Sequence, residues 1–208
     1  MKNSSKHADT LNRFHRSLVK QYKPQPLTPA EPLKALVRAA MSYDVSDSKA
    51  DDAVKAIEKE FVDLNELRVA TDLEIQELLG VRYPQIEKRV AMITQGLNDI
   101  FEREHTLSLD RLKTVSRRDA RNFLRQLPDI HPFVEAYVML VALDGHAVPI
   151  DDEMLETLRE EEIVEEATTL DEAQRFVEHH TKTGDAWDFF SAMRQAAFGD
   201  GRKSKKRK

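Results

Sequence analysis

The sequence predicts an all-α protein, and three observations carry that prediction. Apolar residues recur at spacings of three and four along most of the chain, which is the period of an amphipathic helix. No stretch alternates apolar and polar residues as a half-buried strand does. Several periodic stretches also follow a Ser or Thr that stands three residues before a Glu, a typical helix start. We expect two helical lobes with a helix-hairpin-helix at the centre.

The helix signals divide the chain as follows. A capping box is predicted at Thr28 and Glu31, another at Thr71 and Glu74, and a third at Thr169 and Glu172. Gly80 is expected to end one helix and Pro84 to begin a long one; Asp185 is expected to cap the last helix. We predict one lobe at 28–144 and a second formed by 9–27 and 145–199. Residues 1–8 and the basic tail, 200–208, are expected to be disordered.

The composition excludes several classes of protein. No apolar run approaches the roughly 18 residues of a membrane span, and the N-terminus lacks the apolar core of a signal peptide, so we expect a cytoplasmic location and no membrane partner. Zero cysteines exclude disulfides, thiolate zinc sites and cysteine-ligated iron-sulfur clusters. His146, His179 and His180 show no metal-ligand spacing, so we expect no metal and no cofactor.

The charge is unevenly distributed. The net charge is −5, yet residues 202–208 carry six basic side chains and no acid. Without those six, 26 basic residues stand against 37 acidic ones, a net charge of −11. Tight binding to duplex DNA normally requires the opposite balance, because the phosphates must be neutralised. Two interpretations of the tail stand: salt-dependent affinity for nucleic acid, or a solubilising end.

The chain from Ser116 to Asp151 predicts two helices joined by a tight hairpin. Ser116 is a good N-cap, and Pro128 ends the first helix. Pro132 suits the first turn of the second helix, which Gly145 ends. A short extended segment then delivers Asp151.

The hairpin wording LPDIHPF, residues 127–133, resembles the LPGVGxK hairpin of the helix-hairpin-helix DNA glycosylases, the endonuclease III superfamily. Phe133 takes the position of the hairpin lysine. Asp151 takes that of the family's aspartate, 18 residues later (151 − 133), which matches the family interval. GVRYPQIEKRV, residues 80–90, also resembles a family segment, and the resemblance covers about 28–197. Asp44 stands where the family has a duplex-wedging glutamine, and Glu153 and Glu156 replace a histidine and an arginine.

The resemblance implies a cluster-free protein of base-excision repair. In the family, the aspartate stabilises a sugar cation while a flipped base departs, and the hairpin lysine forms a Schiff base that leads to strand cleavage. Because Phe133 has no amine, the resemblance implies at most base removal by Asp151, without lyase activity. The alternative is a catalytically inactive paralogue that binds nucleic acid or a protein. DNA is the expected partner, bound weakly and partly through the tail, and would make the protein nucleoid-associated.

The residues predicted to contact DNA come from three places. They are the hairpin residues Pro128, Asp129, Ile130, His131 and Phe133, the helical stripe of Arg117, Arg121 and Arg125, and the pair Lys88 and Arg89.

Each of these sites has a second interpretation. Asp129 and His131 stand where the family has glycines. A carboxylate repels phosphate, and a neutral histidine does not attract it. Asp129 and His131 therefore also fit an ordinary turn that binds no phosphate. The arginine stripe also fits a solvated helix face. Asp151 equally fits the N-cap of the acidic helix that follows, where Asp152, Glu153 and Glu156 would raise its pKa.

Overall fold

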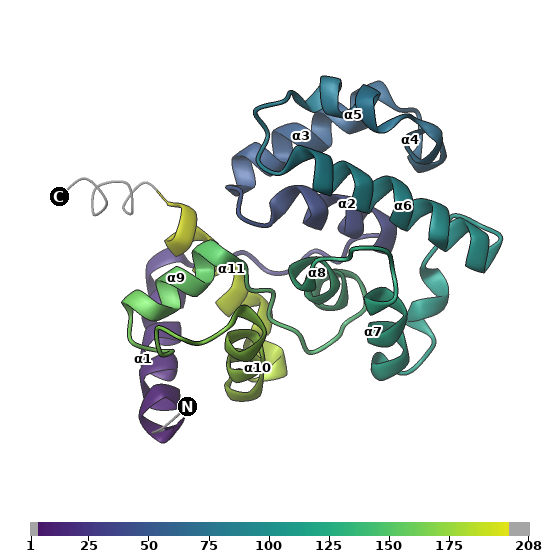
Figure 1. Cartoon of the computed structure of the whole chain (residues 1–208). Helices are drawn as coiled ribbons and strands as arrows, with labels where there is room; N and C mark the ends of the chain where they lie inside the picture. Colours follow the sequence, from purple (N-terminus) through teal and green to yellow (C-terminus); the bar gives the residue numbers. More distant parts are fainter. Residues whose placement is uncertain (1–3, 200–208) are drawn as a thin grey trace.

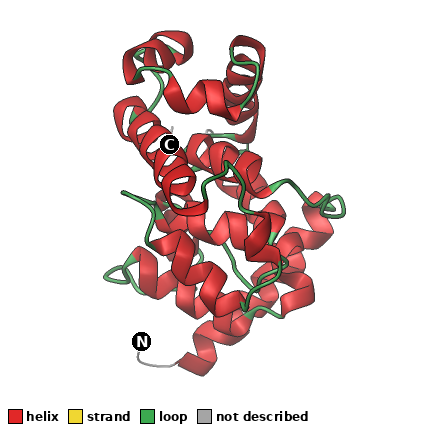
Figure 2. Cartoon of the chain, turned by 90° about the vertical axis from the view of Figure 1, so that its right-hand side faces the viewer, coloured by secondary structure: helices red, strands yellow, loops and turns green. Residues whose placement is uncertain are grey.

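The computed structural model describes residues 4–199, and this part of the chain is built from helices and loops without a strand (Figure 1, Figure 2). The predicted all-α class is therefore confirmed. The helices are α1 (Ser4–Tyr22), α2 (Pro32–Ser42), α3 (Asp47–Glu60), α4 (Leu64–Val69), α5 (Asp72–Leu79), α6 (Ile86–Glu104), the 3-10 turn η1 (Asp110–Lys113), α7 (Arg117–Arg125), α8 (Pro132–Ala142), α9 (Asp152–Glu160), α10 (Leu170–His180), η2 (Thr183–Asp185) and α11 (Ala186–Phe198).

The helices gather in two groups. Helices α2 to α6 pack on one another, with α8 against α2 and α7 against α8, whereas α1 packs on α10 and α11, and α9 on α10 and α11 (Figure 1). Helix α8 also touches α11, so it lies where the groups meet. The division into lobes at 28–144 and at 9–27 plus 145–199 stays a prediction, because packing contacts alone do not define folding units.

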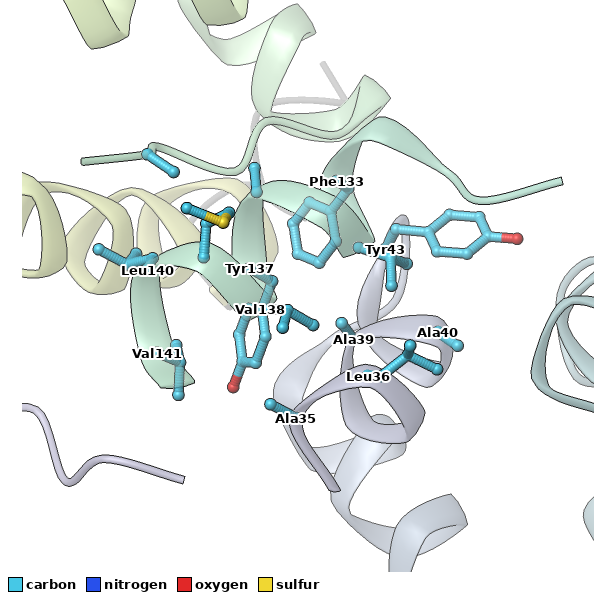
Figure 3. Close-up of a cluster of buried hydrophobic side chains, with 14 of the residues drawn as sticks. Ala35, Leu36, Ala39, Ala40, Tyr43, Phe133, Tyr137, Val138, Leu140 and Val141 are labelled. Atoms are coloured by element: carbon cyan, nitrogen blue, oxygen red, sulfur yellow. The ribbon is translucent and has the colours of Figure 1, made fainter. Parts of the chain in front are cut away.

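The packing of α8 against α2 forms a central part of the core (Figure 3). Every residue of α8 from Phe133 to Val141 is buried, which explains why the apolar residues there surround the helix rather than follow one stripe. The side of α2 that faces α8 carries Ala35 and Ala39, whose small side chains allow the two backbones to approach closely. Leu36, fully buried beside them, contributes about 2 kcal/mol through the hydrophobic effect.

Most helix ends follow the sequence signals. The capping boxes of Thr71 with Glu74 and of Thr169 with Glu172 are both present, and Gly80 ends α5 with a positive φ of 83°. Ser116 caps α7 by accepting a hydrogen bond from the Asp119 amide at 3.1 Å. These ends are confirmed.

Four ends differ from the prediction. Glu31, not Thr28, is the N-cap of α2, because Pro32 suits the first helical position and holds the residue before it extended. Helix α6 begins at Ile86 rather than Pro84, since Gln85 adopts a left-handed conformation. Asp185 precedes α11 without capping it through its side chain. Helix α1 begins at Ser4, so residues 4–8 are helical where disorder was expected, while 1–3 and 200–208 lie outside the described residues.

None of the helices within residues 4–199 combines the length and the hydropathy that crossing a bilayer requires.

Candidate functional site

The hairpin predicted between α7 and α8 is present. The amides of Gln126 and Leu127 donate to the carbonyls of Phe123 and Leu124 at 3.1 Å, which closes α7. Asp129 then adopts a left-handed φ of 48°, a conformation that glycine adopts freely and aspartate tolerates. The backbone therefore keeps a turn that suits glycine, but the exposed carboxylate of Asp129 stands at its tip.

His131 ends the hairpin as the N-cap of α8. Its Nδ1 accepts a hydrogen bond from the Phe133 amide at 3.2 Å, and its ring stacks on Tyr43 with the ring centres 4.3 Å apart. Burial lowers the pKa of His131 to about 4, so the imidazole is neutral at pH 7, as expected. His131 thus joins the hairpin to the loop after α2 and offers no positive charge to a phosphate.

Asp151 is fully buried at the start of α9. Its Oδ1 accepts a hydrogen bond from the Met154 amide at 2.9 Å, which confirms the interpretation of Asp151 as an N-cap. Its Oδ2 accepts one from the Asp44 amide at 3.0 Å and a second from Arg194 Nη1 at 2.7 Å. Both carboxylate oxygens are therefore occupied by groups of the protein itself.

Arg194 of α11 is the functional residue that sequence reasoning missed. Its side chain is 2% exposed and pairs with Asp151 at 2.7 Å and with Asp47 at 3.0 Å. It also donates to the carbonyl oxygens of Val45 at 2.5 Å and Ser42 at 3.2 Å. One signal was available: an arginine inside the apolar face formed by Phe190, Met193 and Ala197 requires a buried partner.

Arg194 also lies close to both of the positions that the resemblance singled out. Phe133, in the lysine position, is fully buried, and its ring centre lies 5.6 Å from the Arg194 guanidinium. Asp151 lies on the same guanidinium. The fold therefore places the lysine and aspartate positions near the same guanidinium.

The Asp44 side chain turns toward the start of α9. Its carboxylate accepts a hydrogen bond from the Asp152 amide at 2.9 Å, while its own amide donates to Asp151. Asp44 adopts a left-handed φ of 52°, which this reciprocal pair of bonds holds in place. Burial, together with the neighbouring Asp151 and Asp152, raises the pKa of Asp44 to about 6.

Burial also raises the pKa of Asp151, and Arg194 and the two amides oppose that rise. The predicted direction is confirmed, but the main cause is loss of water rather than the acidic residues of α9, of which Glu153 contributes least among the causes. The carboxylate has no exposed surface, and both of its oxygens accept hydrogen bonds from groups of the protein.

The arginine stripe of α7 is engaged in ion pairs. Arg121 Nε lies 2.7 Å from Glu135, whose side chain is 2% exposed, and Arg121 Nη2 lies 3.3 Å from Glu178. Arg125 pairs with Glu135 at 3.1 Å, and Arg117 with Asp144 at 3.2 Å. Arg121 therefore joins α7 to α8 and α10. The side chains of Arg117 and Arg125 are more than half exposed, and DNA contact by these two residues stays a prediction.

The remaining predicted DNA contacts are scattered. Arg89 is fully buried and donates to the carbonyls of Ala40, Tyr43 and Pro84, so it stabilises the end of α2 rather than facing solvent. Lys88 is exposed, and Pro128 and Ile130 are half-buried in the hairpin. Across residues 4–199, no three metal-ligating side chains gather closely enough to hold an ion, and His146 instead contacts the Glu178 carbonyl at 2.7 Å.

Comparison with known proteins identifies the fold. No family model matches the chain, and no curated protein is similar to it in sequence. Solved structures do match. Endonuclease III in a trapped covalent intermediate with DNA has a TM-score of 0.72 and 12% identity, over 90% of this chain and 84% of that one.

Two further structures agree with this match. The 8-oxoguanine glycosylase/lyase of Clostridium acetobutylicum with DNA has a TM-score of 0.71 and 15% identity, over 97% of this chain and 70% of that one. The 3-methyladenine DNA glycosylase of H. pylori bound to 1,N6-ethenoadenine has a TM-score of 0.66 and 14% identity, over 96% and 98%. The chain has the helical DNA-glycosylase fold, and the fold that the hairpin predicted is confirmed.

Replacing Asp151 by asparagine tests the buried ion pair. Asparagine keeps the cap acceptor but leaves Arg194 buried beside a neutral group, so we expect the free energy of unfolding to fall by about 3 kcal/mol in urea titrations. Asp152→Asn, at the exposed neighbouring position, should change it by less than about 0.5 kcal/mol. In the double variant with Arg194→Met, part of the loss should be recovered; strictly additive losses would argue against coupling of the two charges.

Asp44→Asn tests the raised pKa of Asp44. Between its ordinary value of 3.8 and about 6, the folded state binds this proton and the unfolded state does not. Wild-type stability relative to Asp44→Asn should therefore increase as the pH falls from about 6 to 3.8, and stay constant above that window. Urea titrations across this range measure the difference. A parallel pH dependence in both proteins would show that Asp44 titrates normally.

Proposed function

We propose that this protein is a DNA-repair glycosylase-like protein that binds DNA without removing bases. The proposal rests on the burial and ion pairing of Asp151. This side chain is fully buried, and Arg194 lies 2.7 Å from its carboxylate. Base removal needs an open carboxylate beside the sugar, where positive charge develops as the base departs. The Arg194 guanidinium already lies on the Asp151 carboxylate, and its positive charge would repel the positive charge that develops on the sugar.

Strand cleavage is a separate step and lacks its nucleophile. It needs an amine that attacks the sugar and forms a Schiff base. Phe133 has no amine, and its side chain packs in the core near Phe190, with ring centres 6.0 Å apart. We therefore propose that lyase activity is absent.

DNA binding rests on the fold and on the tail. Two of the similar structures, endonuclease III and the Clostridium acetobutylicum enzyme, are complexes with DNA. The hairpin keeps the left-handed turn at Asp129, with Arg117 and Arg125 exposed nearby on α7. Because the chain without its tail is strongly acidic, the six basic residues of 202–208 would supply much of the affinity, which makes binding weak and salt-dependent.

One observation favours a second candidate, base removal without strand cleavage. Asp151 occupies the N-terminus of α9, and its carboxylate accepts hydrogen bonds from the buried Arg194 and from the backbone amides of Asp44 and Met154. A movement of α11 that withdrew Arg194 would free the Asp151 carboxylate beside the loop after α2. DNA binding in either form implies association with the nucleoid.

Base release separates the two candidates. Duplexes with oxidised, alkylated or mismatched bases are incubated with the protein, and abasic sites are revealed by alkali. The proposal expects no release on any substrate. Release by the wild type that Asp151→Asn abolishes and Asp152→Asn retains would overturn it in favour of the second candidate, provided that thermal melts show Asp151→Asn folded at the assay temperature.

Removal of residues 202–208 tests the contribution of the tail to DNA binding. Six positive charges correspond to a decrease of roughly 5 in the slope of log K against log salt, because each neutralised phosphate contributes about 0.9. Gel shifts over a salt series measure both slopes. Lys88→Ala, which removes one exposed charge, should change the slope by about 1 or less. Equal slopes with and without the tail would exclude it as a DNA contact.

A further inference from the structure

Large apolar side chains are exposed where α3, α4 and α5 meet. Val62, in the turn after α3, is 91% exposed, and Val69, at the end of α4, is 63% exposed. Leu73, at the start of α5, is 62% exposed. Scattered exposed apolar residues are ordinary, but exposed apolar residues that border a hollow indicate an interaction surface, and Val62 and Val69 each border one.

Two hollows lie on this surface and share Phe61. The first, of about 740 Å³, has Val62 in its wall, over an apolar floor that includes Leu33 and Ile57. The second, of about 580 Å³, has Val69 and Leu78 in its wall. Phe61 lines both hollows, so they lie next to each other at this side chain, and we call the two together the α3–α5 face.

The rim of the α3–α5 face is acidic. Among residues 4–199, Lys34 is the one basic residue that lines either hollow. Glu58, Glu60 and Glu77 are exposed and form no ion pair within residues 4–199. The acidic residues that line the two hollows are Glu31, Glu58, Asp63 and Asp110 in the first and Glu60, Glu66, Glu74 and Glu77 in the second.

The α3–α5 face is separate from the Asp151 site. It lies at the start of α2, whereas Ser42, at the end of that helix, contacts Arg194. Helices α3 to α5 also lie on the side of the molecule away from α9 and α10 (Figure 1). The negative charge of the rim repels nucleic acid, so DNA is not the occupant.

We propose that the α3–α5 face binds a basic amphipathic segment of a partner protein. Lysine or arginine side chains of that segment face the acidic rim, and its apolar side chains enter the hollows beside Val62 and Val69, as in helix-in-groove recognition. The chain's own tail, GRKSKKRK, has the positive charge that suits the acidic rim, but it contains no large apolar residue that could enter the hollows.

A synthetic helical peptide with one leucine face and one lysine face serves as the probe, and amide shifts of the 15N-labelled full chain report where it binds. We expect shifts at 57–78 and saturable binding. The double variant Val62→Asp and Val69→Asp, exposed enough to fold normally, should weaken binding at least about tenfold. Val81→Asp is the matched control, since Val81 is 83% exposed and lines neither hollow.

Three results would overturn the proposal. If the double variant Val62→Asp and Val69→Asp binds the peptide as well as or better than the wild type, the peptide is held by general charge attraction and not by the apolar hollows. Equal binding of a peptide with the same composition in scrambled order would remove the need for an apolar face. A dimer in sedimentation velocity that Val62→Asp and Val69→Asp dissociate would assign the α3–α5 face to a second copy of this chain.

Discussion

The buried ion pair between Arg194 and Asp151 is the interaction on which the rest of the site depends. It joins the last helix to the start of α9, and through Asp47 and the carbonyls of Ser42 and Val45 it also holds the end of α2 and the start of α3. Two charges removed from water remain stable together only with close geometry and additional hydrogen bonds, and both partners have them here. The same contacts that stabilise the junction of the two helix groups also occupy both carboxylate oxygens of Asp151.

The hairpin keeps a backbone path that suits glycine although it carries other residues. Asp129 keeps a conformation that favours glycine, and His131 caps α8 while its ring stacks on Tyr43. Arg89 lies over the same tyrosine, with its guanidinium carbon 3.6 Å from the ring centre, and donates to the carbonyls at the end of α2. Polar side chains therefore serve packing around the hairpin. The proposed DNA contact there falls to the backbone and to the exposed arginines of α7.

Acidic charge has different roles in different parts of the molecule. Glu135 is buried and balances Arg121 and Arg125, which ties α7 to α8. The acidic residues along the α3–α5 face stay on the surface next to exposed valines. The two proposals assign these charges different partners: DNA for the basic tail and a basic protein segment for the α3–α5 face.

The sequence by itself determined the local structure. Local signals specify the helices and their order, because each acts within a few residues of the chain. These signals are the 3.6-residue period, the capping boxes of Thr71 and Thr169, the prolines around the hairpin and the interval from Phe133 to Asp151. Only the tertiary structure decided the state of Asp151. Its partner Arg194 lies 43 residues away on another helix, and neither burial nor pairing of the carboxylate is encoded near position 151. A charged side chain takes its chemistry from whatever surrounds it in space, and that is fixed only when the helices pack.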